Sequence, residues 1–430
     1  MHDSPVQPTG SFRLAQWQML LATMFCYLFY YTGRQTFGFA IPGIERELGF
    51  DKQTLGWCST ALLWSYAIGQ AINGNLGDKF GGRRMMSLGA VLSCGLNWLV
   101  SISSSFTGLL AGWGLNGYAQ SMGWAPGGRV LSNWWSHRER GKVFGFYVFA
   151  AGCSSILSFV TSLVILEVME LDWRWIFRLP VLLLGGAGIL YFLIARDRPQ
   201  DLGFEPPEDE EALSDEAAQV TETDTTGQTA ETSFDRYRSA LGNIRFMIAA
   251  LSIGFQNLAR YGLLIWVPVH FMGEGWKKSN TLASSWVVVA LPVGMALGAL
   301  VSGWVSDRLL GSKRWPIITG FMLLATATSG LMFITPREDI VTGLVLLFLS
   351  GFLVYGPQSV FWALCPDLLG RERSATGTGV MNCVAYIFAG LGEPLIGWAI
   401  DSRGDDTALV FLIVAVACLC SAALGPLIRR

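Results

Sequence analysis

Long apolar runs separated by short polar segments make up most of this chain. A hydrocarbon core roughly 30 Å thick needs about 20 mostly apolar residues for each helical crossing. The runs therefore predict an all-α membrane protein with twelve transmembrane helices. The runs cover residues 17–42, 54–77, 85–104, 107–127, 142–166, 175–195, 242–270, 282–306, 315–334, 340–365, 374–400 and 406–428.

Composition and motifs narrow the class of protein further. Only 14% of the residues are charged, against roughly 25% in an ordinary soluble domain. The net charge of −2 gives no basic field, so we expect no nucleic-acid partner. The eight cysteines show no CxxC or other metal-ligand spacing. Hydrolase, metalloprotease and P-loop motifs are absent as well, so we expect no enzyme, no cofactor, no metal and no ATP-driven pump.

Lysine and arginine between the runs predict the orientation, because they accumulate in cytoplasmic loops. The basic clusters all fall on one side if both termini lie inside. They are Lys79/Arg83/Arg84, Arg138/Arg140/Lys142, Arg308/Lys313/Arg314, Arg371/Arg373 and Arg429/Arg430. The first run follows a polar start and shows no cleavage site, so we interpret it as a spanning helix. We expect a multi-pass protein of the inner (plasma) membrane with both termini in the cytoplasm.

The two halves of the sequence resemble each other in position as well as in composition. Arg34 and Pro42 return 226 positions later as Arg260 and Pro268. Other pairs return at offsets close to this: Gly74-x-x-x-Asp78 as Gly303-x-x-x-Asp307, and Arg138-Glu139-Arg140 as Arg371-Glu372-Arg373. This parallel repeat predicts two pseudo-symmetric six-helix bundles, 1–196 and 241–430. The segment 197–240 between them is acidic and Thr-rich, which predicts a flexible cytoplasmic linker.

Two intramembrane arginines are the main candidates for chemistry. Arg34 lies eight residues before Pro42, about 12 Å along a helix, and Arg260 has the same relation to Pro268. An arginine at mid-membrane costs at least about 2.5 kcal/mol, so it usually faces a wet cavity or a partner. Two planar guanidinium groups suit bidentate binding of an oxyanion. The alternative is that each arginine pairs structurally with a carboxylate.

Other side chains near this depth extend the candidate substrate site. Glu393 lies eight residues before Asp401, which we interpret as a depth similar to that of the arginines. It is a proton-coupling carboxylate, a partner for one arginine, a contact for a cationic substrate group, or a neutral acid near Pro394. The aromatic candidates for the cavity wall, which also have a plain packing interpretation, are Tyr30, Tyr31, Phe37, Trp124, Tyr261, Trp266 and Tyr355.

The chain resembles the organophosphate:phosphate antiporters of the major facilitator superfamily. The segment from Gly74 to Arg84 is similar to the superfamily's signature between helices two and three, where acidic and basic residues form ion pairs that gate the cytoplasmic side. The more specific motifs are Tyr30-Tyr31-Thr32-Gly33-Arg34, Asn116-Gly-x-x-Gln120-x-Met122-Gly123-Trp124, Trp134-Trp135-Ser136-x-x-Glu139-Arg140-Gly141, Arg260-Tyr261-Gly262 and Tyr355-Gly356-Pro357. The gating candidates are Asp78, Arg83, Asp307, Arg308 and Arg140.

The resemblance implies two bundles that rock around a central cavity, with Arg34 and Arg260 at the positions that bind the phosphoryl group. It implies a monomeric carrier of glycerol-3-phosphate or a sugar phosphate by alternating access, in exchange for inorganic phosphate. The alternatives are a transporter-like sensor of a sugar phosphate and a proton-coupled symporter of an organic anion. The chain departs from the family pattern, which has two lysines, a histidine and an acid, at Gln35, Gln70, Ala151 and Pro292.

Overall fold

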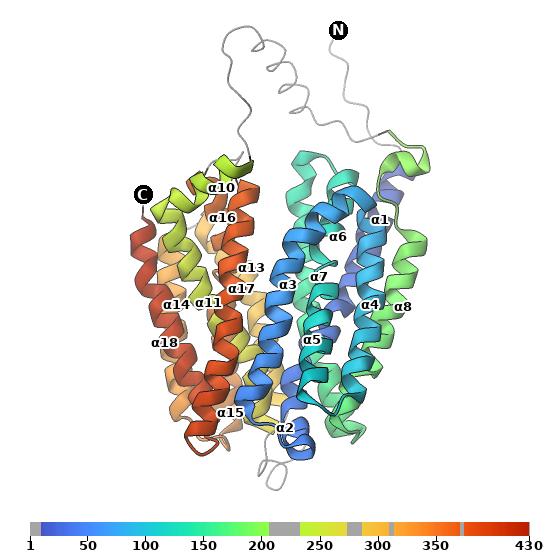
Figure 1. The fold of residues 1–430 in the computed structure, drawn as a ribbon. Coiled ribbons are helices and arrows are strands. Elements are labelled where there is room, and N and C mark those ends of the chain that lie inside the picture. The colour runs from blue at the N-terminus through green and yellow to red at the C-terminus, as the bar shows by residue number, and fades with distance from the viewer. Residues whose placement is uncertain (1–9, 206–232, 273–285, 309–313, 370–373, 430) are drawn as a thin grey trace.

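The structure is a computed structural model that describes residues 10–205, 233–272, 286–308, 314–369 and 374–429. These residues form helices and connecting turns, with no strand among them. The helices before residue 206 lie side by side in one group, which we call the N-group, and those after residue 232 form the C-group (Figure 1). The start of α1, the short helix α10 and the end of α18 lie at one end of the molecule (Figure 1). We call this the linker end and the opposite one the far end.

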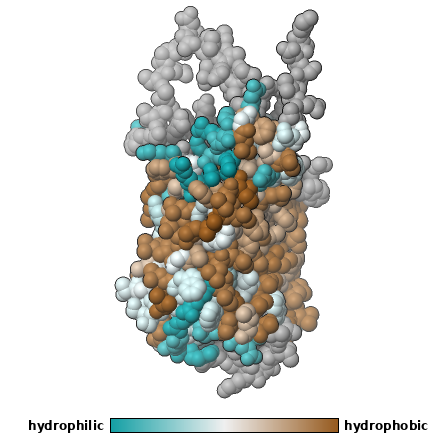
Figure 2. Space-filling view, turned by 90° about the vertical axis from the view of Figure 1, so that its right-hand side faces the viewer, coloured by the Kyte–Doolittle hydropathy of each residue, from teal (hydrophilic) through white to brown (hydrophobic). Residues whose placement is uncertain are grey.

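The helices of the N-group are α1 (Gly10–Tyr30), α2 (Phe37–Leu48), α3 (Lys52–Phe80), α4 (Gly82–Ile102), α5 (Phe106–Gln120), α6 (Trp124–Trp134), α7 (His137–Leu163) and α8 (Leu179–Ile194). Those that follow are α10 (Ser233–Gly242), α11 (Ile244–Met272), α13 (Ala290–Arg308), α14 (Trp315–Ile334), α15 (Ile340–Tyr355), α16 (Gln358–Leu369), α17 (Ser374–Ser402) and α18 (Leu409–Leu424). Apolar side chains cover the middle of the outer surface and polar ones gather toward the ends (Figure 2), as expected for a protein surrounded by lipid.

Eight helical segments in the described part are long and apolar enough to cross a membrane. They are Gly82–Ile102, Val143–Val168, Trp173–Ile194, Ile244–Met272, Trp315–Ile334, Ile340–Leu369, Gly377–Ser402 and Leu409–Ile428. Two further expected crossings, 17–42 and 107–127, are each divided into shorter helices, and a third, 54–77, falls within α3. The fourth, 282–306, is described only from residue 286 onward.

The break in the first crossing corrects the expectation that Arg34 lies inside one continuous helix. α1 ends at Tyr30, a 3-10 turn covers Tyr31–Gly33, and α2 begins at Phe37. A break inside a membrane frees backbone groups that need new partners. The Gly33 carbonyl accepts hydrogen bonds from the side-chain amides of Asn97, at 3.1 Å, and Asn116, at 2.7 Å. Polar side chains of α4 and α5 therefore stabilise the break.

The neighbourhood of this turn also explains its glycine. A Cβ atom at Gly33 would lie 2.6 Å from the Gln120 amide nitrogen and 2.9 Å from the Ser93 hydroxyl. On the other side of the turn, the Ser154 hydroxyl of α7 accepts a hydrogen bond from the backbone N–H of Tyr31 at 3.1 Å. The turn is thus fixed by contacts from three helices of the N-group, α4, α5 and α7, and these contacts define the position of Arg34, which follows the turn.

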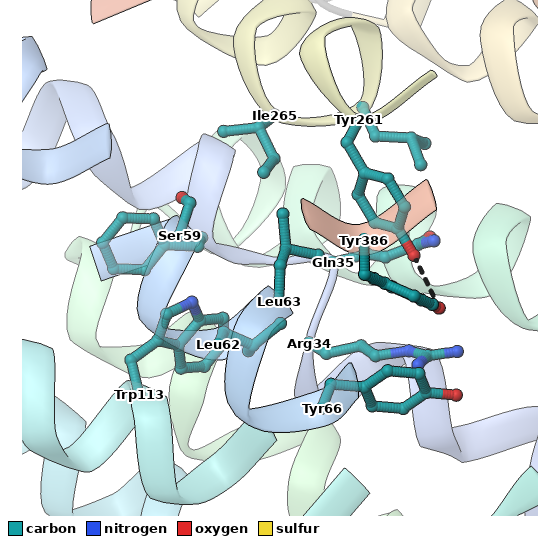
Figure 3. Close-up of a pocket in the computed structure, with 12 residues that line it drawn as sticks. Arg34, Gln35, Ser59, Leu62, Leu63, Tyr66, Trp113, Tyr261, Ile265 and Tyr386 are labelled. Atoms are coloured by element: carbon teal, nitrogen blue, oxygen red, sulfur yellow. Dashed lines mark hydrogen bonds between the residues drawn. The ribbon is translucent and has the colours of Figure 1, made fainter. Parts of the chain in front are cut away.

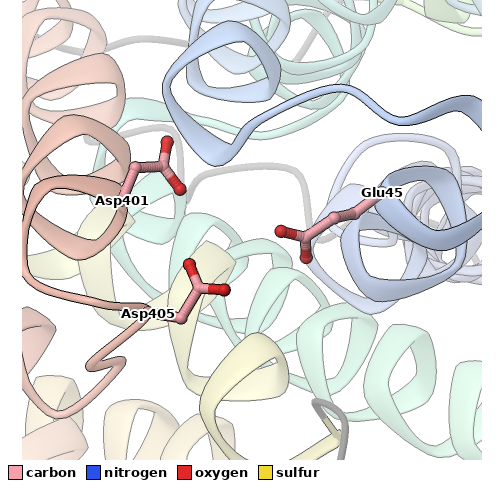
Figure 4. A group of neighbouring side chains, drawn as sticks. All are labelled: Glu45, Asp401 and Asp405. Carbon is pink, nitrogen blue, oxygen red and sulfur yellow. The ribbon is translucent and has the colours of Figure 1, made fainter.

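The N-group and the C-group meet along a seam formed mainly by α2 and α3 on one side and α11 and α17 on the other. Lys52 forms ion pairs with Glu45 of its own group and, at 3.1 Å, with Asp405 of the C-group. Figure 4 shows the carboxylates of Glu45, Asp401 and Asp405 around a common space at this level. The Gln53 backbone N–H donates to Asp401 at 2.8 Å. The seam is therefore tied together at the far end.

Further hydrogen bonds continue the seam toward the middle of the molecule. The Thr60 hydroxyl donates to the Gly390 carbonyl at 2.6 Å, and the Trp64 indole donates to the Ile387 carbonyl at 3.5 Å. Among the described residues, every hydrogen bond between the two groups involves α3 residues from Lys52 to Trp64. This is the half of α3 nearer the far end, so the described hydrogen bonds across the seam lie in that half.

Candidate substrate-binding site

Arg34 follows the helix break and lies among three tyrosines. Its guanidinium is 4.1 Å from the ring centroid of Tyr31 and 4.7 Å from that of Tyr66. One of its terminal nitrogens donates to the Tyr27 hydroxyl at 3.5 Å. The side chain is half-buried. Aromatic faces attract a guanidinium but carry no net charge, so these contacts hold Arg34 without neutralising it.

Arg260 reaches the same region from the C-group on an unbroken helix. α11 runs through Arg260 and Pro268 without interruption, and the arginine is only 7% exposed. Its guanidinium is 4.3 Å from the ring centroid of Tyr355 and 4.9 Å from that of Tyr261. Its Nε atom is buried and has no hydrogen-bond partner among the described residues. A buried donor without a partner is costly, which makes Arg260 a strong candidate to bind an incoming anion.

A chain of tyrosine rings connects the surroundings of the two arginines across the seam. The rings of Tyr66 and Tyr386 have centroids 5.0 Å apart, and those of Tyr386 and Tyr261 are 5.8 Å apart. The Tyr261 hydroxyl donates to the Tyr386 hydroxyl at 3.3 Å. Figure 3 shows these hydroxyls on the same side of the pocket as the Arg34 guanidinium. Tyr31 lies within electrostatic reach of both arginines.

Neither arginine forms an ion pair with a carboxylate in the described part of the chain. Arginines elsewhere do: Arg13 pairs with Glu139 at 2.9 Å, and Arg174 pairs with Glu47. The alternative in which Arg34 and Arg260 have structural carboxylate partners therefore finds no support among these residues. A cation–π contact contributes about 0.5–2 kcal/mol, less than the several kcal/mol that desolvating an ion costs. The region consequently keeps a net positive charge.

A small pocket adjoins Arg34 on the side that faces the far end (Figure 3). Its free volume is about 20 Å³, enough for a single water molecule. Beyond the polar groups its walls are apolar, with side chains from both groups: Phe37, Leu62, Leu63, Trp113, Leu264 and Ile265. These side chains close the path from the arginines to the far end.

The other predicted substrate contacts divide into two sets. Tyr31, Tyr261 and Tyr355 each lie against an arginine, as described above. Trp124 stacks on Tyr147 with ring centroids 4.5 Å apart and lies 5.4 Å from the ring of Tyr27. Tyr27 therefore lies between Trp124 and Arg34, and the tryptophan supports the site from one layer behind.

Three tyrosines of the site were not among the sequence candidates. Tyr27 lies seven residues before Arg34, two helical turns away, but the helix break between them obscures this relation. Tyr66 and Tyr386 come from apolar runs in which a single tyrosine is not distinctive. Gln35, one of the departures from the family pattern, also lines the pocket, and its buried side-chain oxygen has no hydrogen-bond partner in the described part of the chain.

Glu393 is not brought into this pocket. It is completely buried, and its Oε2 atom accepts a hydrogen bond from the Trp266 indole at 2.8 Å. Trp266 follows Arg260 by six residues on α11, about 9 Å nearer the far end. The depth expected from the sequence was that of the arginines. The structure instead places this carboxyl group beside Trp266, at the level where the Glu393 backbone packs against Gly56 of α3.

The predicted gating residues are only partly described. The side chains of Asp78, Arg140, Asp307 and Arg308 lie outside the described part of the structure. Arg83 is described: its Nε donates to the Phe192 carbonyl at 2.7 Å, and its guanidinium lies over the Phe192 ring at 4.4 Å. These contacts attach the start of α4 to α8 within the N-group.

Comparisons with known proteins agree with this architecture. The family model described as Major Facilitator Superfamily matches residues 23–393. A probable hexose phosphate transport protein of Chlamydia pneumoniae is 28% identical over 91% of this chain and 86% of its own. A glycerol-3-phosphate transporter of Bacillus subtilis is 26% identical over 94% of this chain and 90% of its own.

The crystal structure of a bacterial homologue of the human lysosomal transporter Spinster, inward-facing and unoccupied, superposes with a TM-score of 0.72 at 14% identity. It covers 97% of this chain and 98% of the other.

Proposed function

The chain belongs to the major facilitator superfamily, and from this premise we propose that it transports a small organic phosphate in exchange for inorganic phosphate. Glycerol-3-phosphate and hexose phosphates are the substrate classes that the names of its relatives suggest. Transport proceeds by alternating access, and the protein is a carrier rather than an enzyme.

The observation that supports this proposal best is the pair of arginines without carboxylate partners. Arg34 and Arg260 come from the two groups of helices and are held by tyrosine rings. Each guanidinium presents a planar fork that matches two oxygens of a phosphoryl group. An anion between them removes their mutual repulsion and supplies the acceptor that the Arg260 Nε lacks. The tyrosine hydroxyls around them are available to the organic part of the substrate.

We further propose that the linker end faces the cytoplasm and that the protein works as a monomer in the inner membrane. The basic clusters of the sequence support this orientation. With this orientation, the conformation described above is closed toward the outside and receives substrate from the cytoplasm. Binding of the anion draws the two groups together around Arg34 and Arg260, and the seam from Lys52 to Trp64 then opens toward the outside.

Counterflow in proteoliposomes tests the proposal. Vesicles that contain the purified protein are loaded with inorganic phosphate, and uptake of labelled glycerol-3-phosphate or glucose-6-phosphate is measured without a pH gradient. We expect uptake that depends on internal phosphate and that Arg34→Lys or Arg260→Lys abolishes, since a lysine offers no bidentate fork. Arg174→Lys, at a surface ion pair of the far end, is the matched control and retains uptake.

Two outcomes would reject this assignment. Near-normal uptake in both lysine variants would show that the arginines do not bind the substrate. Binding of the organic phosphate without any flux would instead identify a sensor, and uptake driven by a pH gradient in the absence of internal phosphate would identify a proton-coupled symporter.

A further inference from the structure

Glu393 is a buried acid that the proposed exchange mechanism does not use. It lies on α17 where this helix packs against α3 of the other group. A Cβ atom added at Gly56 of α3 would lie 2.7 Å from both the Glu393 carbonyl oxygen and the Pro394 Cα. Only a glycine fits there, so the backbones of the two groups approach each other directly beside Glu393. The Glu393 side chain is completely buried in this closed arrangement.

Within the described residues the Glu393 side chain has a single polar partner. Its Oε2 accepts from the Trp266 indole at 2.8 Å, and its Oε1 is buried without a partner. The charged and titratable groups described on the elements packed around it are Arg245, Arg260, Tyr261 and His270 on α11, Lys52, Cys58, Tyr66 and Lys79 on α3, Glu45, Arg46 and Glu47 on α2, Cys418 and Cys420 on α18, and Cys383, Tyr386 and Asp401 on α17. None of them forms a hydrogen bond or an ion pair with Glu393.

The nearest cations are engaged elsewhere. Arg260 lies over the rings of Tyr261 and Tyr355, and Lys52 pairs with acidic groups at the far end. A carboxylate buried without a cation is strongly disfavoured, and in practice such a group takes up a proton. The closed seam therefore accommodates Glu393 as a neutral carboxylic acid.

We propose that Glu393 is a proton-binding site that must be occupied for the seam to close. This inference rests on the proposed alternating-access function. When the seam opens toward the far end, water reaches Glu393 and the carboxyl group releases its proton. Closing the seam requires that the carboxylate takes one proton back from the water on that side. The acid then enters the buried position beside Trp266 and Gly56.

The proton enters and leaves on the same side of the membrane. Between Glu393 and the far end, the seam consists of contacts that opening would separate, among them the hydrogen bond between Gln53 and Asp401. Toward the linker end, the apolar residues Leu62, Leu264 and Ile265 lie around the pocket between the groups. The proton therefore controls the rate of exchange and is not a transported ion.

The experiment compares exchange rates at different external pH with internal pH held constant. Phosphate exchange is measured in proteoliposomes of uniform orientation for the wild type and for Glu393→Gln, which stays neutral and retains an acceptor for Trp266. The phosphate substrate itself titrates in this range, since phosphate esters have a second pKa of about 6. The ratio of the wild-type rate to the variant rate removes that contribution.

We expect this ratio to fall as external pH rises, by up to about tenfold per pH unit once most of the carboxyl groups are ionised. Changing internal pH leaves the ratio unchanged. Glu47→Gln is the matched control at the same end. This exposed carboxylate bonds to Arg174 and Trp173 of its own group, and the hydrogen bond from Arg174 holds the pKa of Glu47 below its usual value. It stays charged, so its substitution leaves the wild-type pH dependence intact.

A ratio that is constant over external pH would overturn the inference, and so would an equal response to internal pH. Infrared spectroscopy tests it independently of whether Glu393→Gln inserts. The wild type should show the C=O band of a buried carboxylic acid, and Trp266→Phe should shift this band to higher frequency because the hydrogen bond is lost. Absence of such a band would also overturn the inference. If the wild type does not exchange phosphate at all, the proposed function fails instead.

Discussion

Arg34 and Arg260 are matching positions of the sequence repeat, yet the two groups present them in different ways. Arg260 projects from an unbroken helix and is almost fully buried, with a nitrogen that has no partner. Arg34 follows a break whose backbone is satisfied by Asn97 and Asn116, and it is half-buried. A repeat in sequence thus preserves the chemical group at the site without preserving the backbone that carries it. In the N-group, Asn97 and Asn116 donate hydrogen bonds to the backbone at the break. In the C-group, the backbone around Arg260 is bonded within α11.

Substituting either arginine should have the largest effect on substrate binding. The two substitutions should differ in their effect on the melting temperature. Arg34→Ala and Arg260→Ala each remove hydrogen bonds to a charged phosphate, which contribute about 1.5–3 kcal/mol each. We expect phosphate affinity to fall by about 100-fold in both variants. Without substrate, Arg260→Ala should raise the melting temperature because it removes a buried charge, whereas Arg34→Ala should change it less. Calorimetric titration and thermal unfolding in detergent measure the two quantities. Equal changes in melting temperature would contradict the difference in burial between Arg34 and Arg260.

Enlarging the glycine before Arg34 should disturb the site more than a similar change near Arg260. A Cβ at Gly33 would contact Gln120 and Ser93, whose amide and hydroxyl support the break. At Gly262 the nearest atom, at 2.9 Å, is the terminal methyl of Ile396. Overpacking costs about 1–3 kcal/mol, and we expect Gly33→Ala to reach this range in thermal unfolding and to weaken transport. Gly262→Ala is the control and should stay below it. A reversed order would show that the break tolerates rearrangement.

Deleting one amide donor should destabilise the backbone turn between α1 and α2 while the arginine itself stays unchanged. Asn116→Leu leaves the Gly33 carbonyl with Asn97 as its one remaining side-chain donor. Loss of a buried hydrogen bond costs about 1–3 kcal/mol when the partner stays unsatisfied, so we expect a loss of about 1 kcal/mol with a matching drop in transport. Asn257→Leu is the C-group control, because its amide bonds to the Ile253 carbonyl within an intact helix and to the Gln256 side chain. It should leave Arg260 in place and phosphate affinity nearly unchanged.

The smallest effect is expected at the far end of the seam. The Asp405 side chain is 66% exposed, and exposed ion pairs contribute about 0.2–1 kcal/mol. Asp405→Asn should therefore shift the balance between closed and open seam by a few-fold at most. Distance measurements between labels on the two groups at this end can detect the shift, with labels at the linker end as reference. A complete opening would mean that the ion pair between Lys52 and Asp405 is the contact that keeps the seam closed.

Several of these features could be predicted from the sequence. The apolar runs indicate a multi-pass helical protein, and the repeat singles out Arg34 and Arg260 as related intramembrane charges. Hydropathy alone could not predict the helix break, because the short polar stretch Tyr31–Thr36 carries no proline and fits equally well a continuous helix with polar side chains facing a cavity. The sequence indicates the break only indirectly. Asn97 and Asn116 are amides inside other apolar runs, where they need hydrogen-bond partners such as a free backbone carbonyl.

The depth of Glu393 shows a second limit of the sequence. Counting eight residues from Asp401 on α17 and eight from Pro268 on α11 assumes that both residues mark the same level. In the structure Glu393 lies beside Trp266, six residues past Arg260. Distances counted along separate helices do not fix their relative height, which depends on packing such as that of Gly56 against α17. The aromatic partners Tyr66 and Tyr386 escaped prediction because a single tyrosine in an apolar run is not distinctive.

The contact between the rings of Tyr66 and Tyr386 has a mechanical consequence. Lys52 lies fourteen residues from Tyr66 on α3, which is about 21 Å along the helix axis. When two rigid bodies turn about a point, displacement grows with distance from it. A rotation about this ring pair opens the Lys52 level by several ångströms while the two rings barely separate. The residues that recognise the cargo then move least, although the ends of the helices travel far.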